Sequence, residues 1–119
     1  MPHAQRVVEL VTARLNPRQC REWVTVETVG AAGGWGDSYA PAQRTRAAVD
    51  ATRKLVRDQG GSEVVSESTL LLHPTLTRDA EDLFTPDSRV TVRGRTARVI
   101  TCQQVVSRGR LVYVEVTTS

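Results

Sequence analysis

The sequence predicts an all-β fold, a small antiparallel barrel or sandwich of about six strands. Apolar and polar residues alternate along three stretches of the C-terminal third, and glycine turns separate these stretches. A chain of 119 residues is long enough for one modest core and too short for two. Short antiparallel strands tend to close into a barrel, because closure removes unpaired sheet edges. We therefore treat residues 1–119 as a single β-barrel domain.

The N-terminal segment, residues 1–17, carries a helical pattern. Its apolar residues recur at helical spacing, at Val7, Val8, Val11 and Leu15. Asn16 is placed to cap such a helix and Pro17 to stop it. We predict a helix over residues 3–15. Valine also favours strands, so both conformations stay open for this segment.

The next element is a strand, followed by a long loop. In REWVTVETV, Trp23, Thr25 and Glu27 alternate with a more apolar face that is expected to enter the core. Residues 30–43 then contain four glycines and no period, which predicts a loop. Its aromatic residues, Trp35 and Tyr39, are candidate interface residues because such side chains supply contact area. The equal alternative is that they fold back over the domain's own core.

Residues 44–72 predict a long hairpin. RDQGGSE is a turn sequence, and EVVSESTLLL after it alternates as a strand does. Residues 47–58 also suit a helix by composition. We favour two strands near residues 44–57 and 62–72, the first bent at Asp50–Ala51 as long barrel strands often are.

A connector and three strands complete the chain. Within HPTLTRDAEDLFTPD, residues 77–84 are expected to hold one helical turn, capped by Thr77 or Asp79 and anchored to the core by Leu83 and Phe84. SRVTV, TARVITCQQVV and LVYVEVTT then predict three strands joined by the turns RGR and SRGR. These turns carry four arginines, which are Arg93, Arg95, Arg108 and Arg110.

The sequence offers no convincing catalytic, cofactor or metal site. His73, before a proline, is expected to be a surface residue, and the acidic run around Asp79 and Glu81 lacks the spacing of a calcium loop. Cys20 and Cys102 are far apart and lack zinc-site spacing, so we expect two reduced, buried thiols. GAAGGWG lacks the Lys-Ser/Thr of a phosphate loop. We therefore expect no enzyme activity, no cofactor and no metal.

The net charge of the chain excludes few classes of binding partner. The net charge is +3, and nearly all of the cations are arginines scattered along the chain, which is too mild to define a nucleic-acid-binding protein. No run of apolar residues approaches the length of a membrane span, so a soluble protein without membrane contact is expected. The four turn arginines are candidates for contacts with acidic neighbours or with phosphates, since guanidinium suits both. Solvated hairpin tips are the equal alternative.

One known family has this order of features. The chain resembles the head-to-tail stopper (head-completion) proteins of long-tailed bacteriophages in DLFTPDSRVTVRGRTARVITCQQ and in the preceding hairpin KLVRDQGGSEVVSESTL. The similarity covers roughly residues 44–118. The resemblance implies a structural virion protein, a small β-barrel that forms a homo-oligomeric ring, closes the portal channel after DNA packaging and offers a docking surface to the tail.

The resemblance also implies partners and a location. Portal and adaptor proteins would lie above the ring and a tail terminator below it, with genomic DNA in non-specific contact in the channel. The protein would reside in the virion neck, and in the host cytoplasm during assembly. Two alternatives remain, namely another connector component, such as an adaptor or tail terminator, and a stand-alone nucleic-acid-binding barrel. Such a barrel usually exposes aromatics on its sheet, and Tyr113 is the only aromatic on the C-terminal strands.

Overall fold

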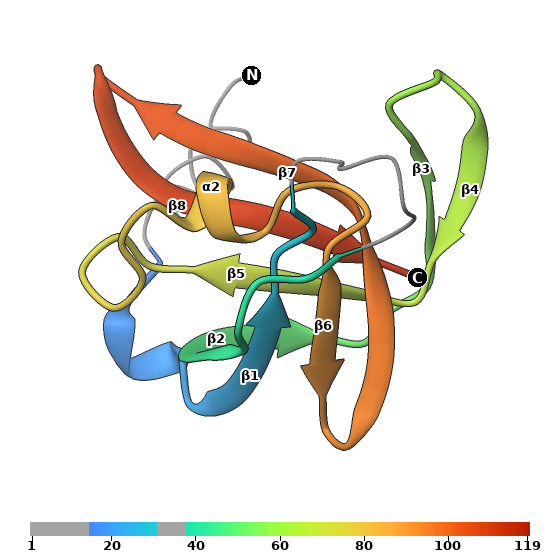
Figure 1. Cartoon of the computed structure of the whole chain (residues 1–119). Coiled ribbons are helices and arrows are strands. Elements are labelled where there is room, and N and C mark those ends of the chain that lie inside the picture. The colour runs from blue at the N-terminus through green and yellow to red at the C-terminus, as the bar shows by residue number, and fades with distance from the viewer. Residues whose placement is uncertain (1–14, 31–37) are drawn as a thin grey trace, which may run out of the picture.

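The computed structural model describes residues 15–30 and 38–119, and in it six antiparallel strands form a closed barrel in the order β1-β2-β5-β8-β7-β6 (Figure 1). The barrel strands are β1 (Glu22–Glu27), β2 (Gln43–Asp50), β5 (Ser68–Leu72), β6 (Arg89–Val92), β7 (Arg95–Ser107) and β8 (Arg110–Thr118). Pairing of β1 with β6 closes the ring of strands. The predicted all-β fold and the barrel closure are therefore confirmed.

The barrel is filled mainly by valine and leucine. Val24 and Val26 of β1, as expected, point inward and are 1% exposed. The other large members of the core are Leu70, Leu72, Phe84, Val90, Val99, Val114 and Val116. Alternation along the strands directs these side chains to one interior, except that of Phe84, which lies in the connector between β5 and β6.

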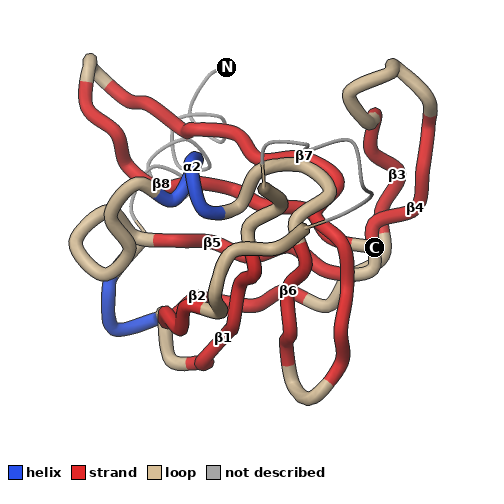
Figure 2. The backbone as a smooth tube through the Cα atoms, viewed as in Figure 1, coloured by secondary structure: helices blue, strands red, loops and turns tan. Residues whose placement is uncertain are grey.

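Short helical turns lie beside the barrel (Figure 2). A 3-10 helix, η1 (Pro17–Gln19), begins after Asn16, whose side chain accepts a hydrogen bond from the backbone N–H of Arg18. Asn16 and Pro17 thus start a turn, because proline at a first helical position loses no hydrogen bond. The helix predicted over residues 3–15 lies outside the described residues. Within the described ranges, no helix is long and apolar enough to cross a membrane.

The helical turn predicted in the connector is α2 (Ala80–Leu83). Phe84 after it is fully buried, and Leu83 packs against the core, as predicted. Neither predicted cap forms. Asp79 occupies the N-cap position with a φ of 53° and makes no side-chain capping bond, while Thr77 is buried and hydrogen-bonds to Thr45 instead.

The hairpin predicted over residues 44–72 forms, but its outer half leaves the barrel. β2 ends at Asp50, where the predicted bend occurs, and the chain resumes as β3 (Lys54–Arg57). β3 pairs with β4 (Glu63–Ser66) in a separate two-stranded sheet, while β2 pairs with β5 inside the barrel. The Asp50 carboxylate accepts the backbone N–H of Thr52 at 3.0 Å, which stabilises the bend.

The last three strands are joined by two Arg-Gly turns. Arg93 and Gly94 have φ values of 52° and 78°, and Arg108 and Gly109 have 52° and 76°. Two successive residues of positive φ match the twist of a tight hairpin, and glycine adopts this region without strain. β7 pairs first with β6 and then with β8, and its irregularities near residues 100 and 106 let the strand curve between them.

Buried hydroxyl groups fix the base of the β3–β4 hairpin to the barrel. The Ser66 hydroxyl donates to the backbone oxygens of Ser68 and Thr118 at 3.0 and 3.2 Å. The Ser68 and Thr118 hydroxyls are hydrogen-bonded to each other at 2.6 Å. Since Ser66 and Thr118 are both 0% exposed, these bonds are shielded from water and orient the hairpin relative to the end of β8.

Candidate assembly surfaces

The β3–β4 hairpin stands away from the barrel (Figure 1). Its loop is closed by Asp58, whose backbone N–H donates to the Ser62 oxygen and whose carboxylate accepts the Ser62 N–H, both at 2.9 Å. At its base, Arg53 forms an ion pair with Glu67 at 2.8 Å and Lys54 one with Glu115 of β8 at 3.0 Å. The hairpin is therefore anchored at one end and free along its length.

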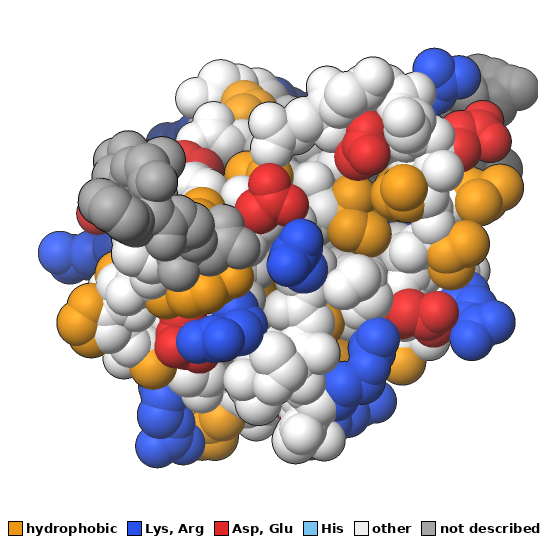
Figure 3. All heavy atoms as spheres, turned by 45° about the vertical axis from the view of Figure 1, so that its right-hand side comes forward, with side chains coloured by type: hydrophobic (Ala, Val, Ile, Leu, Met, Phe, Trp, Pro, Cys, Tyr) orange, Lys and Arg blue, Asp and Glu red, His pale blue; other side chains and the backbone are white. Residues whose placement is uncertain are grey.

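One face of this hairpin is apolar and faces solvent. Leu55 and Val65 are directly paired across the strands and are 68% and 48% exposed. The face turned forward in Figure 3, which includes the right-hand side of Figure 1, likewise carries apolar side chains beside basic and acidic ones. A two-stranded sheet is only marginally stable in water. Docking against another chain would cover the exposed apolar pair and stabilise the hairpin, so the pair suits a contact surface.

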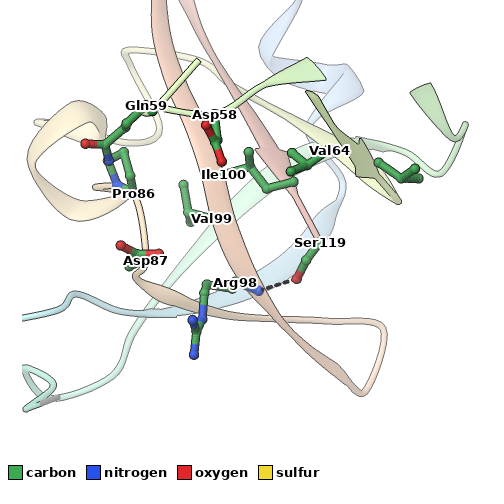
Figure 4. A pocket seen from close by; sticks show the side chains of 11 residues that line it. Asp58, Gln59, Val64, Pro86, Asp87, Arg98, Val99, Ile100 and Ser119 are labelled. Carbon is green, nitrogen blue, oxygen red and sulfur yellow. Dashed lines mark hydrogen bonds between the residues drawn. The ribbon is translucent and has the colours of Figure 1, made fainter. Parts of the chain in front are cut away.

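A groove separates the hairpin from the barrel. Its volume is about 430 Å³, and Figure 4 shows Asp58 and Gln59 at one end and Asp87 and Arg98 at the other. Apolar side chains line the middle, among them Val64, Pro86, Val99 and Ile100. The groove floor is held in place where the Arg98 backbone N–H donates to the Ser119 hydroxyl at 2.9 Å. This mixture of apolar lining and charged ends suits a polypeptide segment.

The β7–β8 turn carries a second exposed apolar pair. Val106 and Leu111 are cross-strand partners, 54% and 37% exposed, and the exposed Arg108 and Arg110 flank the turn beside them. In Figure 1 this tip projects on the opposite side of the barrel from the β3–β4 hairpin. The molecule thus has two separate apolar pairs at two projecting ends.

The four turn arginines are not brought together. Arg93 and Arg95 lie at one end of β7, and Arg108 and Arg110 at the other. Arg93 donates two hydrogen bonds to Glu22, at 2.6 and 2.7 Å, and this pairing lowers the pKa of the Glu22 carboxyl. Arg95 donates to the backbone oxygen of Ser119 at 3.0 Å. The predicted contacts with DNA or neighbouring subunits stay predictions for all four.

Of the two loop aromatics, Tyr39 lies against the barrel and Trp35 lies outside the described residues. Tyr39 is half-buried and forms an isolated bridge with Val29. The Arg89 guanidinium sits 4.3 Å from the centre of the Tyr39 ring and also donates two hydrogen bonds to Glu27. Tyr39 thus packs against its own barrel, and its role as an interface residue stays a prediction.

The titratable residues weighed for catalysis are half-buried or exposed. His73 is half-buried, its Nδ1 accepts the backbone N–H of Thr75 at 3.1 Å, and partial burial lowers its pKa. Asp79 before α2 and Asp82 within it are exposed, and Glu81 is half-buried. Within residues 15–30 and 38–119, no group of three His, Cys, Asp or Glu side chains is placed to hold a metal ion. The expected lack of enzyme activity stays a prediction.

We expect slow alkylation of Cys102 in the folded protein. Both cysteines are free thiols, Cys20 being buried and Cys102 half-buried. Burial, and secondarily the Glu81 charge, raises the pKa of the Cys102 thiol from 9.0 to about 11, which leaves about 100-fold less thiolate at pH 8. Iodoacetamide labelling, followed on the Cys102 peptide by mass spectrometry, should therefore be about 100-fold slower in buffer than in urea. Equal rates would contradict this burial.

Neither a scan against models of known protein families nor a search of curated proteins gives a match for this chain. The features of this chain that suit contact with other molecules are the two projecting hairpins and the groove.

Proposed function

We propose that the protein is a ring-forming head-to-tail connector of the bacteriophage neck, of the stopper type, that closes the portal channel after packaging and offers a docking surface to the tail. The observation that carries this proposal is the β3–β4 hairpin, which holds the exposed Leu55–Val65 pair outside a closed barrel. A barrel needs no such extension for its own core, so the extension suits contacts with other chains.

The arrangement of the exposed pairs supports a ring. A heterologous contact joins one surface of a subunit to a different surface of the next copy. Repeating this contact produces a closed ring when the rotation between subunits closes. The Leu55–Val65 pair and the Val106–Leu111 pair lie on different projecting hairpins. Arg108 and Arg110 at one tip are opposite in charge to Asp58 and Asp87, which line the groove beside the other hairpin together with Arg98. The strand-dominated fold also favours a stopper over an adaptor, which should be mainly helical.

Deletion of the gene in its phage tests the proposal. Without a stopper, packaged heads should fail to retain DNA and to join tails, so electron microscopy should show emptied heads beside free tails of normal length, and a plasmid copy should restore infectious particles. Overlong tails would assign the chain as a tail terminator instead. Normal particle yield without the gene would refute a connector role altogether.

Ring formation is tested separately with the purified protein. Sedimentation velocity across a range of concentrations, with and without purified portal–adaptor complex, should show a discrete oligomer that the complex promotes. A strictly monomeric chain that does not bind the portal–adaptor complex would contradict the proposal.

A further inference from the structure

We infer that the outer face of β1 and β2 binds the phosphate backbone of nucleic acid, through Arg44, Arg46 and the nearby Arg78. This inference rests on the proposed function only for the source of the nucleic acid, which would be the genome passing through the neck. Its test uses the isolated chain and different residues from the ring contacts, so that failure of one proposal is distinguishable from failure of the other.

The first observation is an exposed tryptophan packed against two guanidinium groups. Trp23 is 56% exposed because its neighbours Val24 and Val26 take the inward positions of β1. Strand pairing places Arg46 opposite Trp23 and Arg44 opposite Thr25, so the arginines share its outer face. The Arg44 and Arg46 guanidinium carbons lie 4.6 and 5.5 Å from the Trp23 ring centre. These are cation–π contacts, which hold both cations over the ring.

The second observation is that, among the described residues, neither of these arginines forms an ion pair. Glu22, Glu27, Glu67 and Glu115 each form an ion pair with a different basic residue. In the part of the chain that the structure describes, Arg44 and Arg46 have no such partner. An exposed arginine pair supported by an aromatic ring keeps its N–H donors available for an anionic ligand.

The third observation is a groove that continues from this pair. A groove of about 350 Å³ is lined by Arg44 and Arg78, together with hydroxyl and amide side chains, among them Gln43, Thr45, Thr75 and Thr77. No carboxylate lines it among the described residues. The Thr45 and Thr77 hydroxyls hydrogen-bond to each other at 2.5 Å, which fixes two of the groove's lining side chains. Two cations in one groove, with the exposed Gln43 amide beside them as a neutral donor, match a phosphodiester group.

The ligand class follows from the geometry. The groove accepts a phosphate, and the arginine pair beside it places further positive charge along the same outer face, which suits a polymer of phosphates. The arginines cover the indole ring, so Trp23 acts as a positioning residue for them. Recognition through phosphates alone is independent of sequence, so we expect duplex and single-stranded nucleic acid to bind.

Fluorescence anisotropy with a labelled 20-base-pair duplex and a labelled oligothymidine of 20 nucleotides tests this inference. Three phosphate contacts predict a slope of log K against log salt of about −3, which weakens binding about 40-fold between 50 and 200 mM salt. Arg44→Ala and Arg78→Ala should each weaken binding by about tenfold and reduce the slope by about 1. Arg57→Ala, which removes an equal charge from the β3–β4 hairpin, should leave binding unchanged.

The tryptophan has its own test. Trp23→Leu should weaken binding a few-fold with an unchanged salt slope, because no charge is removed, and Trp23→Phe should restore most of the affinity. Binding of either probe with these variant effects supports the inference. Lack of binding by both probes at 50 mM salt would overturn it. So would a loss in Arg57→Ala equal to the loss in Arg44→Ala, which would indicate non-specific attraction by net charge alone.

Discussion

Replacing Phe84 with alanine is expected to destabilise the fold by about 3–5 kcal/mol. Phe84 is 0% exposed and is the only aromatic member of the described core cluster, where it packs among valines and leucines. Truncation loses the transfer free energy of the ring and leaves a cavity that the closed barrel cannot easily collapse to fill. A domain of this size is stable by about 5–15 kcal/mol in total, so a large share would be lost.

Urea denaturation followed by circular dichroism measures this effect. The midpoint should fall with little change in the slope of the transition, because the surface exposed on unfolding stays similar. Leu55→Ala is the matched control, since Leu55 is 68% exposed and its truncation should cost less than about 0.5 kcal/mol. Equal losses in the two variants would mean that Phe84 does not occupy the core.

The barrel is predictable from the sequence because its strands share one pattern, an apolar residue at every second position. Val114 and Val116 lie two residues apart and are buried, and the same spacing at Val24 and Val26 places their strand against the same interior. The Arg-Gly turns set the strand boundaries through backbone geometry that glycine favours. Phe84 was also predicted to anchor the connector, because a large apolar residue after a short polar turn has few other places to pack.

The departure of the hairpin from the barrel was not predictable in the same way. Residues 44–57 contain no glycine or proline to separate β2 from β3. The separation depends on tertiary pairing, because β5 takes β8 as its neighbour from Ser68 onward and leaves β3 and β4 to pair only with each other. The sequence pattern of Leu55 and Val65 is that of any strand, so it does not indicate that both side chains face solvent, as they do in the structure.

The charged surfaces also depend on long-range register. The turn sequence makes Arg93 a candidate contact residue, but it does not indicate that Arg93 pairs with Glu22, which lies 71 residues away in the chain. Trp23 was correctly assigned to the polar face of its strand. Its contact with Arg44 and Arg46 requires the register between β1 and β2, which alternation alone does not define.

Changing Leu55 and Val65 together to aspartate is expected to abolish head-to-tail joining while the barrel stays folded. Both side chains are already solvent-exposed in the isolated chain, so the barrel core is untouched, and repulsion between the two opposed carboxylates acts on the hairpin alone. In an assembled ring the same positions would be desolvated, and burying an unpaired carboxylate at each would cost about 2 kcal/mol or more. Together they would weaken subunit association by a factor of about 10³.

Complementation of the gene deletion measures this effect, scored by emptied heads beside free tails, with circular dichroism of the purified variant as the folding check. Thr96→Asp with Gln104→Asp is the matched control, because it adds two equal charges at exposed strand positions outside the hairpin.

Single alanine substitutions of His73, Asp79 and Glu81 should leave joining nearly intact, since polar residues on a connector usually cost little when truncated. If these alanine variants stopped joining while the hairpin variant was silent, contact through the hairpin would be refuted, and a chemical site near residues 73–82 would have to carry the function.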